Sequence, residues 1–398
     1  MAKKVPFHKS PAYNVMSYGA HADGTTDDVA HILSAITAAG SAPVYFPPGT
    51  YYLASRLTIP GYANLLGAGM ASSWLKGPVS PGSNGSFTDM KIGADNFDTS
   101  LKTVSNLTFT RCRFHGGGGT DASGYNPNPA HLMTVGGGWD GAGNNWTVTN
   151  VLFDACEVEA NIGPTETYMD IAMKCGTGAS DTKVESILFH DCHFLGNSPG
   201  ITVEMYSTHD ADHYVGIKDV NFDGCTFEAV RATSIDYSGA PAVGGVFPTG
   251  HSYVRDCHFL GNGIGTPIWS NAVTIEKGSS YVEVSGCDFA RCTQRAVSIQ
   301  DGGSYNLIDG NTIDYRVNSN VAIGTASMIS VEEGSNGGTR TNNTITNNTI
   351  YDSSPGASSY GIALYSDSND STVTGNTITG GTVLNQGSGN TVSGNTYL

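Results

Sequence analysis

Three acidic residues, Glu204, Asp236 and Glu276, are the groups in this sequence best placed to do chemistry together. Each one ends a short segment in which apolar and small residues precede a polar one, namely ITVE, TSID and VTIE. If these segments are strands stacked in register, neighbouring carboxylates lie about 5 Å apart. Like charges at that distance raise at least one pKa, which leaves a proton donor beside a carboxylate. Glycoside hydrolysis needs such a pair, and the pair that acts decides between retention and inversion.

The same segment pattern recurs along the chain and predicts one outward column of residues on one sheet. Read in order, the final positions are Gly93, Gly136, Lys174, Glu204, Asp236, Glu276, Gln300, Glu332 and Tyr365. We expect Lys174, next to Glu204 in this column, to join the three acids as a catalytic residue; an ordinary surface ion pair is the alternative. For the acids, the alternative is that they accept hydrogen bonds from the turns that follow, as in EKGSS and VEEGS.

Aromatic and histidine side chains gather near the middle of this column and are candidates for binding a sugar. Flat rings pack against the apolar face of a pyranose, and histidine and tyrosine also transfer protons. Packing between loops is the alternative for each ring. The predicted substrate-binding residues are Tyr206, His209, Tyr237, Trp269, Trp139 and Tyr168.

Metal binding remains an open alternative. The run YSTHDADHY at 206–214 contains His209, Asp210, Asp212 and His213, but this spacing matches no helical zinc motif. We expect no required cofactor, and Ca²⁺ bridging the acidic column to the substrate is kept as the alternative.

A second repeated feature is a corner motif that must position the column. Ten segments such as LTFTRCRF, VEVSGCDF and NLIDGNTI place one Cys or Asn between apolar residues. An inward Asn can satisfy turn groups that would otherwise be buried without a partner, and Cys fills the same corner as a small apolar group. Parallel side chains are badly oriented for bridging, so free buried thiols are expected. The motif positions are Cys112, Cys156, Cys192, Cys225, Cys257, Cys287, Asn311, Asn348, Asn376 and Asn395.

The start of the chain predicts one helix followed by short strands. Thr25 to Asp28 form a polar cap before apolar residues at helical spacing, and the helix is expected over 27–39. Strands are expected at 44–46, 51–53 and 57–59, around the breaker Pro47-Pro48-Gly49.

The combination SYGAHADGTTDD, helix, VYFPPGTYYL and NLLGAGM resembles the opening of right-handed parallel β-helix proteins of the pectate-lyase superfamily, which include phage tailspike depolymerases. The resemblance implies an all-β, single-chain solenoid of roughly ten turns with a short N-terminal capping helix. We expect residues 1–70 to form the capping segment and first coil, and residues 71–398 one continuous body. The superfamily spans hydrolases, lyases, epimerases and binding proteins, so the reaction does not follow from the fold.

Composition excludes several partners. The formal net charge is −16 with 19 Lys and Arg, which argues against nucleic acid or an anionic membrane surface. No apolar run is long enough to span a bilayer and no secretion signal is evident, so we expect a soluble protein, acting outside cells after lysis or on a phage particle. The open edge after GNTYL makes a homotrimer one solution.

The acidic, cation-poor column favours hydrolysis of a glycan as the function. The alternatives are a Ca²⁺-dependent lyase or epimerase acting on uronates, and a glycan-binding tailspike or adhesin without catalysis.

Overall fold

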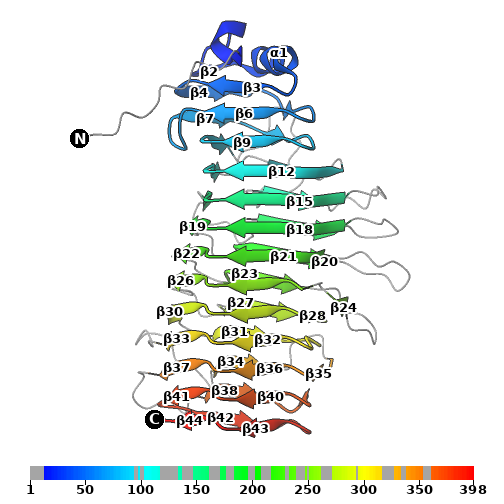
Figure 1. Ribbon diagram of the computed structural model, residues 1–398, viewed down its shortest axis with the longest axis vertical. Coiled ribbons are helices and arrows are strands. Elements are labelled where there is room, and N and C mark those ends of the chain that lie inside the picture. The colour runs from blue at the N-terminus through cyan, green and yellow to red at the C-terminus, as the bar shows by residue number, and fades with distance from the viewer. Residues whose placement is uncertain are drawn as a thin grey trace, which may run out of the picture.

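The chain winds into a column of three parallel β-sheets with one helix at its N-terminal end (Figure 1). This computed structural model describes residues 13–93, 97–98, 103–116, 133–136, 147–160, 171–175, 183–195, 202–207, 217–228, 233–238, 247–248, 251–260, 271–292, 295–315, 327–332, 338–352 and 360–398. Within these ranges each turn of the coil, here called a rung, gives one strand to sheets A and B, and every rung except the first and the last also gives one to sheet C. The predicted all-β parallel solenoid with a short helix is confirmed.

Three sheets, A, B and C, run the length of the described chain. Sheet A contains β1 Tyr13–Asn14, β3 Pro43–Phe46, β6 Asn64–Gly67, β9 Ser86–Thr88, β12 Val104–Thr110, β15 Thr147–Asp154, β18 Lys183–His190, β21 Ile217–Asp223, β25 Tyr253–Arg255, β29 Glu283–Ser285, β32 Leu307–Asp309, β36 Thr344–Thr346, β40 Thr372–Thr374 and β43 Thr391–Ser393. Sheet B contains β2 Asp23–Asp27, β4 Gly49–Tyr52, β7 Ser73–Lys76, β10 Lys91–Gly93, β13 Arg113–Gly116, β16 Glu157–Ala160, β19 His193–Leu195, β22 Thr226–Glu228, β26 His258–Leu260, β30 Asp288–Cys292, β33 Thr312–Tyr315, β37 Thr349–Asp352, β41 Thr377–Thr379 and β44 Thr396–Tyr397. Sheet C contains β5 Leu57–Thr58, β8 Val79–Ser80, β11 Phe97–Asp98, β14 Met133–Gly136, β17 Ile171–Cys175, β20 Val203–Ser207, β23 Ile235–Ser238, β27 Asn271–Glu276, β31 Arg295–Ile299, β34 Ser327–Val331, β38 Tyr360–Leu364 and β42 Thr382–Asn385.

Two short pairings accompany the large sheets. β24 (Phe247–Pro248) pairs with β28 (Ser279–Ser280), and β35 (Arg340–Thr341) pairs with β39 (Ser368–Asn369). Sheets A and B each hold 14 strands within the described residues, so the expectation of roughly ten rungs is too low. The rungs missed are N-terminal, where the corner of the coil is Pro47, Ala68 or Met90 instead of Cys or Asn.

The helix α1 (Val29–Ala39) covers the N-terminal end of the coil, with the 3₁₀ helix η1 (Val15–Tyr18) beside it. Buried Asp28 precedes α1 and accepts hydrogen bonds from the backbone N–H groups of His21 and Ala22 at 2.7 and 3.1 Å. Four residues on one face of α1 are buried: Ile32, Ala35, Ile36 and Ala39. The predicted capping helix is confirmed, and it shields the first apolar rung from water.

Phenylalanine ladders fill the core between the sheets. Five rings of sheet A stack with centroids 4.6 to 5.0 Å apart: Phe87, Phe109, Phe153, Phe189 and Phe222. Four rings of sheet B stack at 4.4 to 4.9 Å: Phe194, Phe227, Phe259 and Phe289. These spacings match the distance between neighbouring strands, so the rings pack only when the rungs are in register.

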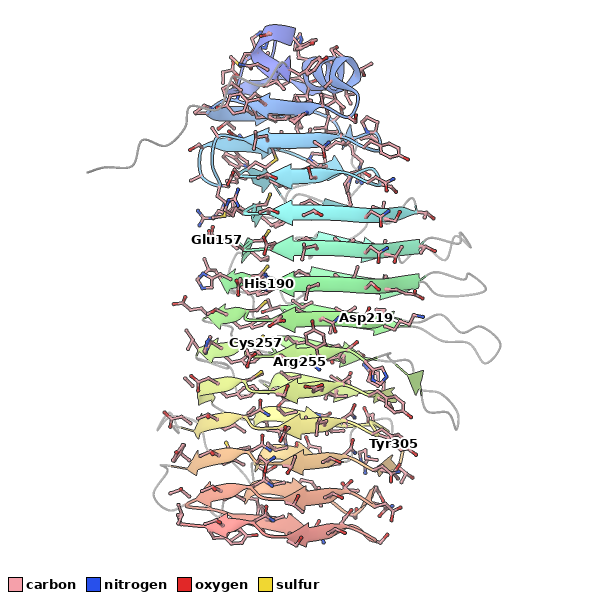
Figure 2. All side chains as sticks on the ribbon, in the orientation of Figure 1. Glu157, His190, Asp219, Arg255, Cys257 and Tyr305 are labelled. Atoms are coloured by element: carbon pink, nitrogen blue, oxygen red, sulfur yellow. The ribbon has the colours of Figure 1, made fainter. Side chains whose placement is uncertain are left out.

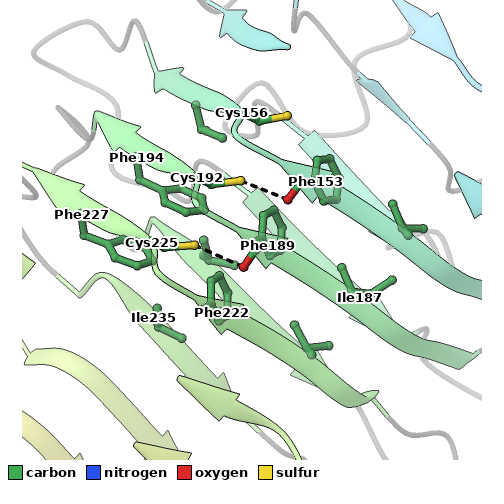
Figure 3. Close-up of a cluster of buried hydrophobic side chains, with 14 of the residues drawn as sticks. Phe153, Cys156, Ile187, Phe189, Cys192, Phe194, Phe222, Cys225, Phe227 and Ile235 are labelled. Atoms are coloured by element: carbon green, nitrogen blue, oxygen red, sulfur yellow. Dashed lines mark hydrogen bonds between the residues drawn. The ribbon is translucent and has the colours of Figure 1, made fainter. Parts of the chain in front are cut away.

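The predicted corner column is confirmed as a row of buried, free cysteines. Cys192 donates its thiol hydrogen to the carbonyl of Phe153 on the preceding rung at 3.3 Å, and Cys225 does the same to Phe189 (Figure 3). Burial raises the pKa of the Cys192 thiol. The thiols therefore act as weak hydrogen-bond donors, a role beyond the apolar filling expected from the sequence.

Asparagine takes over the corner in the C-terminal rungs and makes two bonds where Cys makes one to the preceding rung. Asn311 Nδ2 donates to the carbonyl of Val284 at 2.9 Å, and its Oδ1 accepts from the backbone N–H of Cys287 at 2.9 Å. Asn348 repeats both bonds one rung on, to the carbonyl of Ile308 and the N–H of Asn311. This is the stacked arrangement predicted for the Asn column.

Candidate functional site

The described part of sheet C carries six of the predicted site positions. Lys174 lies on β17, Glu204 and Tyr206 on β20, Asp236 and Tyr237 on β23, and Glu276 on β27. Four predicted substrate-binding residues, His209, Trp269, Trp139 and Tyr168, lie outside the described residues.

Strand register divides the predicted column into two. Glu204 pairs with Ala172 and Asp236, and Asp236 pairs in turn with Thr274. Lys174 belongs to the neighbouring column, two residues further along each strand. That column runs Gly136, Lys174, Tyr206, Ser238 and Glu276.

The prediction of one file through Lys174, Glu204, Asp236 and Glu276 is therefore wrong. Glu276 lies one strand and two residues away from Asp236, and the register partner of Lys174 is Tyr206. A shift of two residues keeps every side chain on its own face, so the apolar pattern of the strands cannot detect it. What register does place on adjacent strands are the positions of Glu204 and Asp236, and beside them the positions of Lys174 and Tyr206.

Alternation along the strands decides which of these positions face outward. Val203, Met205, Ile235 and Tyr237 are buried in the core. Residues between them, at 204, 206, 236 and 238, therefore occupy the outer face of sheet C.

Tyr237 is the clear correction among the predicted substrate-binding residues. Its side chain is only 2% exposed, and its hydroxyl donates to the backbone carbonyl of Val220 at 2.9 Å. Burial raises the pKa of Tyr237 well above its usual value. The residue is part of the core and cannot contact a polysaccharide.

Asp236 is a buried member of the outer face, with 5% of its surface exposed. Below it in the same column come small hydroxyl residues, Thr274, Ser298 and Ser330, all buried. On the N-terminal side of the same column, the register partner of Glu204 is Ala172 on β17. In strand register, the positions of Glu204 and Asp236 thus lie between the uncharged residues Ala172 and Thr274.

Glu276 forms an ion pair with Lys277, a residue that the sequence pattern did not indicate as part of the site. Lys277 Nζ lies 2.5 Å from Glu276 Oε1 and donates to the hydroxyl of Ser238 at 2.8 Å. Ser238 in turn donates to Glu276 Oε1 at 3.1 Å. The ammonium group compensates the Glu276 carboxylate, which favours a positioning role over direct catalysis for Glu276.

Glu332 repeats this arrangement further down the sheet. It accepts from Arg295 Nη2 at 2.8 Å and from the Ser298 hydroxyl at 3.0 Å. Glu276 thus contacts the side chains of the adjacent Lys277 and of Ser238 on the neighbouring strand, and Glu332 contacts Arg295 and Ser298 on the neighbouring strand. The alternative drawn from the sequence gave these acids turn N–H groups as partners. Lys277 and Ser238 were missed because neither follows the strand pattern, although Lys277 directly follows Glu276.

No group of three His, Cys, Asp or Glu side chains suited to a metal ion occurs among the residues that the structure describes. Glu204 and Asp236 supply two neighbouring carboxylate positions, and oxygen ligands are those that Ca²⁺ prefers. Over the same described residues, no helix is long and apolar enough to cross a bilayer.

The stacked parallel sheets, the Cys and Asn corner column and the outer polar face define a parallel β-helix protein with its candidate site on sheet C. Residues 12–231 match the family model described as rhamnogalacturonase A/epimerase, pectate lyase-like, and residues 210–397 match the model of the right-handed β-helix region. The chain belongs to this pectate lyase-like family, and the predicted right-handed parallel β-helix is confirmed.

Several relatives have names that bear on function. The chain is 30% identical over 221 residues to mannuronan C5-epimerase AlgE4 of Azotobacter vinelandii, a match over 50% of this chain and 37% of that protein. It thus spans well under half the length of this relative. The A-module of mannuronan C-5 epimerase AlgE6 from the same organism has a similar fold, with a TM-score of 0.60, 19% identity and coverage of 97% of this chain and 99% of that one. PfbA, a surface adhesin of Streptococcus pneumoniae, gives a TM-score of 0.62 at 14% identity, over 94% of this chain and 91% of that one.

Proposed function

We propose that this protein is a C5-epimerase that acts on a uronate polysaccharide, with mannuronan as the first candidate substrate. The observation that carries the proposal is the register pairing of Lys174 with Tyr206 on the outer face of sheet C, next to Glu204 and Asp236. The similarity to mannuronan C5-epimerases supports the reaction class.

Epimerisation at C5 needs a base that removes the C5 proton and an acid that returns a proton to the opposite face of the sugar. An amine and a phenol on adjacent strands are suited to these two roles, because an ammonium near a phenol favours the phenolate, which is the form that can accept the C5 proton. We assign the proton transfers to Lys174 and Tyr206, with His209 as a further candidate acid.

The carbanion formed at C5 is stabilised when the charge of the sugar carboxylate is reduced. A neutral carboxylic acid can do this by donating a hydrogen bond, and two carboxyls in register favour one protonated member. We assign this role to Glu204 and Asp236. Ca²⁺ bound at the same pair would supply positive charge for the same purpose.

A lyase is the nearest alternative, since it forms the same carbanion and then breaks the C4–O bond to leave a C4–C5 double bond. Glycoside hydrolysis stays a second candidate, because Glu204 and Asp236 are register partners on adjacent strands, and the spacing of adjacent strands, about 4.8 Å, is close to the carboxyl separation that retaining enzymes use. The site holds more positive charge than the sequence predicted, with Lys277 beside Glu276, which weakens the case for hydrolysis.

The test is to incubate the protein with mannuronan, with and without Ca²⁺, and to analyse the product by proton NMR, ultraviolet absorbance and size-exclusion chromatography. The proposal predicts a new C5 epimer at unchanged chain length. Unsaturated chain ends would identify a lyase, shortened saturated chains a hydrolase, and binding without any product an adhesin.

A further inference from the structure

At one corner of the coil, nearly every rung has a residue whose backbone is in the left-handed conformation. This corner lies three residues before the core position of each sheet A strand. Apart from His251, its residues have φ between 51° and 68°. In chain order the column is Tyr62, Asn84, Asn106, Asn150, Ser186, Asp219, His251, Tyr281, Tyr305, Asn342, Asp370 and Gly389.

Most members of the column are residue types that tolerate this backbone conformation. Asn, Asp and Gly enter the left-handed region at low cost, whereas a bulky side chain there is strained. The polar members also bond to one another along the column: Asn106 Nδ2 donates to Asn84 Oδ1 at 2.8 Å, and Asn150 Nδ2 donates to Asn106 Oδ1 at 3.1 Å.

Tyr62, Tyr281 and Tyr305 break this rule, and Tyr281 and Tyr305 do so on two consecutive rungs. Their φ values are 60° and 58°, and their rings stack with centroids 5.3 Å apart and planes 11° apart. His251, one rung earlier, meets Tyr281 edge-on at 6.2 Å. Strained residues that persist without a packing reason point to function.

Core packing does not account for these tyrosines. Tyr281 is 38% exposed and Tyr305 is 42% exposed. Among the described residues, the side-chain contacts of these two tyrosines are the ring contacts with each other and with His251. The next member of the column is Asn342, whose side chain is shorter, so Tyr305 has no aromatic neighbour on that side in the described chain.

The aromatic segment of the column lies beside the candidate site. Tyr281 follows Glu276 on the same rung, after the turn that begins with Lys277. Figure 2 shows Tyr305 on the same long edge of the solenoid as Asp219, an earlier member of the column. A polymer that leaves the Lys174–Tyr206 pair toward the C-terminal rungs therefore has this edge within reach.

We propose that His251, Tyr281 and Tyr305 form an accessory platform that binds the polysaccharide chain where it leaves the candidate site. Phenol hydroxyls one rung apart donate to sugar oxygens, and the open face of Tyr305 takes the apolar face of a pyranose. The identity of the ligand as a uronate polymer rests on the proposed function.

The test is affinity electrophoresis in native gels that contain mannuronan, with dextran gels as the uncharged comparison. Mannuronan is expected to retard the wild-type protein, and the double variant Tyr281→Asn/Tyr305→Asn should bind it about tenfold more weakly. The melting temperature of this variant should be equal or higher, because Asn tolerates the left-handed backbone. Tyr62→Asn is the matched control: it removes a 63% exposed tyrosine from the same column at the far end of the coil and should leave retardation unchanged.

Three results would overturn the platform: no retardation of the wild type by mannuronan, equal retardation of the double variant, or a fall in melting temperature of the double variant that accounts for its weaker binding. Retardation in the gel measures binding and requires no catalytic turnover. The platform proposal can therefore be refuted without refuting the epimerase proposal, and the reverse also holds. Tyrosine-dependent retardation without a C5 product would leave the platform intact, and a C5 product with equal retardation of the double variant would remove only the platform.

Discussion

Lys174 on β17 is the register partner of Tyr206 on β20, so an amine and a phenol occupy adjacent positions on the outer face of sheet C. The same strand places Glu204 two residues before Tyr206, in register with Asp236 on β23. The four positions form a staggered patch, with two on β20 and one on each of its neighbours β17 and β23, and the proposed proton transfers depend on this patch.

Removing either proton-transfer group should abolish most of the activity. Lys174→Met and Tyr206→Phe are each expected to lower kcat by about 10² to 10⁴-fold, the range typical of lost acid–base catalysis. Rates would be followed by NMR of the mannuronan product. Glu276→Gln is the control and should stay within a few-fold of wild type, because Glu276 is already compensated by Lys277. A Tyr206→Phe variant with wild-type kcat would refute the assignment.

The Lys277–Glu276 pair should contribute to stability as a coupled unit. Lys277→Met is expected to lower the free energy of unfolding by about 1–2 kcal/mol, since it leaves a largely buried carboxylate without its cation. Adding Glu276→Gln should recover part of this loss in a double-mutant cycle. Lys218→Met is the matched control, because the Lys218–Glu185 ion pair is more exposed than the Lys277–Glu276 pair. This substitution should change the free energy of unfolding little. Additive losses in urea unfolding would show that the two residues are not coupled.

The Asn column should be more sensitive than the Cys column. Asn348→Ala removes a donor to the carbonyl of Ile308 and an acceptor for the N–H of Asn311, both buried, at a cost of about 2–4 kcal/mol. Asn348→Cys should cost less, because a thiol still donates as Cys225 does to Phe189. Thermal unfolding of both variants, with Cys225→Ala for comparison, measures the ranking. If Asn348→Ala proves no worse than Asn348→Cys, the bonding account of the column is incorrect.

Histidine 190 should make stability depend on pH in a defined direction. The hydrogen bond from the His190 ring to Asp154 at 2.8 Å raises the pKa of His190. The stabilisation of the folded state by protonated His190 is therefore complete below the pKa of histidine in the unfolded chain, about 6.5. It disappears as the pH rises through the higher pKa of His190 in the folded protein. The difference in melting temperature between wild type and His190→Gln should thus be largest near pH 5, about 1.5 units below that value, and should shrink toward alkaline pH. His258→Gln, at a looser contact of 3.9 Å with Asp288, is the control; a gap that widens with pH would contradict the prediction.

The sequence predicted the structure correctly at the corner of the coil, because Cys or Asn fills this one position on most rungs. Cys225 and Asn348 occupy equivalent corners on different rungs, and both donate a hydrogen bond to a carbonyl on the preceding rung. This common role explains why the repeat can be recognised in the sequence. The capping helix was equally accessible, because Asp28 and the apolar spacing after it are local signals.

The candidate site was harder to predict, because the alternation of apolar and polar residues shows which face of a sheet a residue occupies but not which residues of neighbouring strands pair. Asp236 and Glu276 both end an apolar–polar pattern, yet Asp236 pairs with Thr274, two residues before Glu276. Tyr237 was a different kind of error: it follows outward Asp236, so alternation alone would have placed it in the core. The polar corner where Tyr281 and Tyr305 sit carries no apolar pattern and was not detected.

The central claim is that the protein exchanges the proton at C5 of a uronate. The most direct measurement is proton NMR of mannuronan incubated with the protein in deuterium oxide, with Tyr206→Phe as the inactive control. The account predicts that deuterium accumulates at C5 of the epimerised residues while the chain length stays constant. Products in which C5 retains its original hydrogen, or chains that shorten without any exchange at C5, would contradict it.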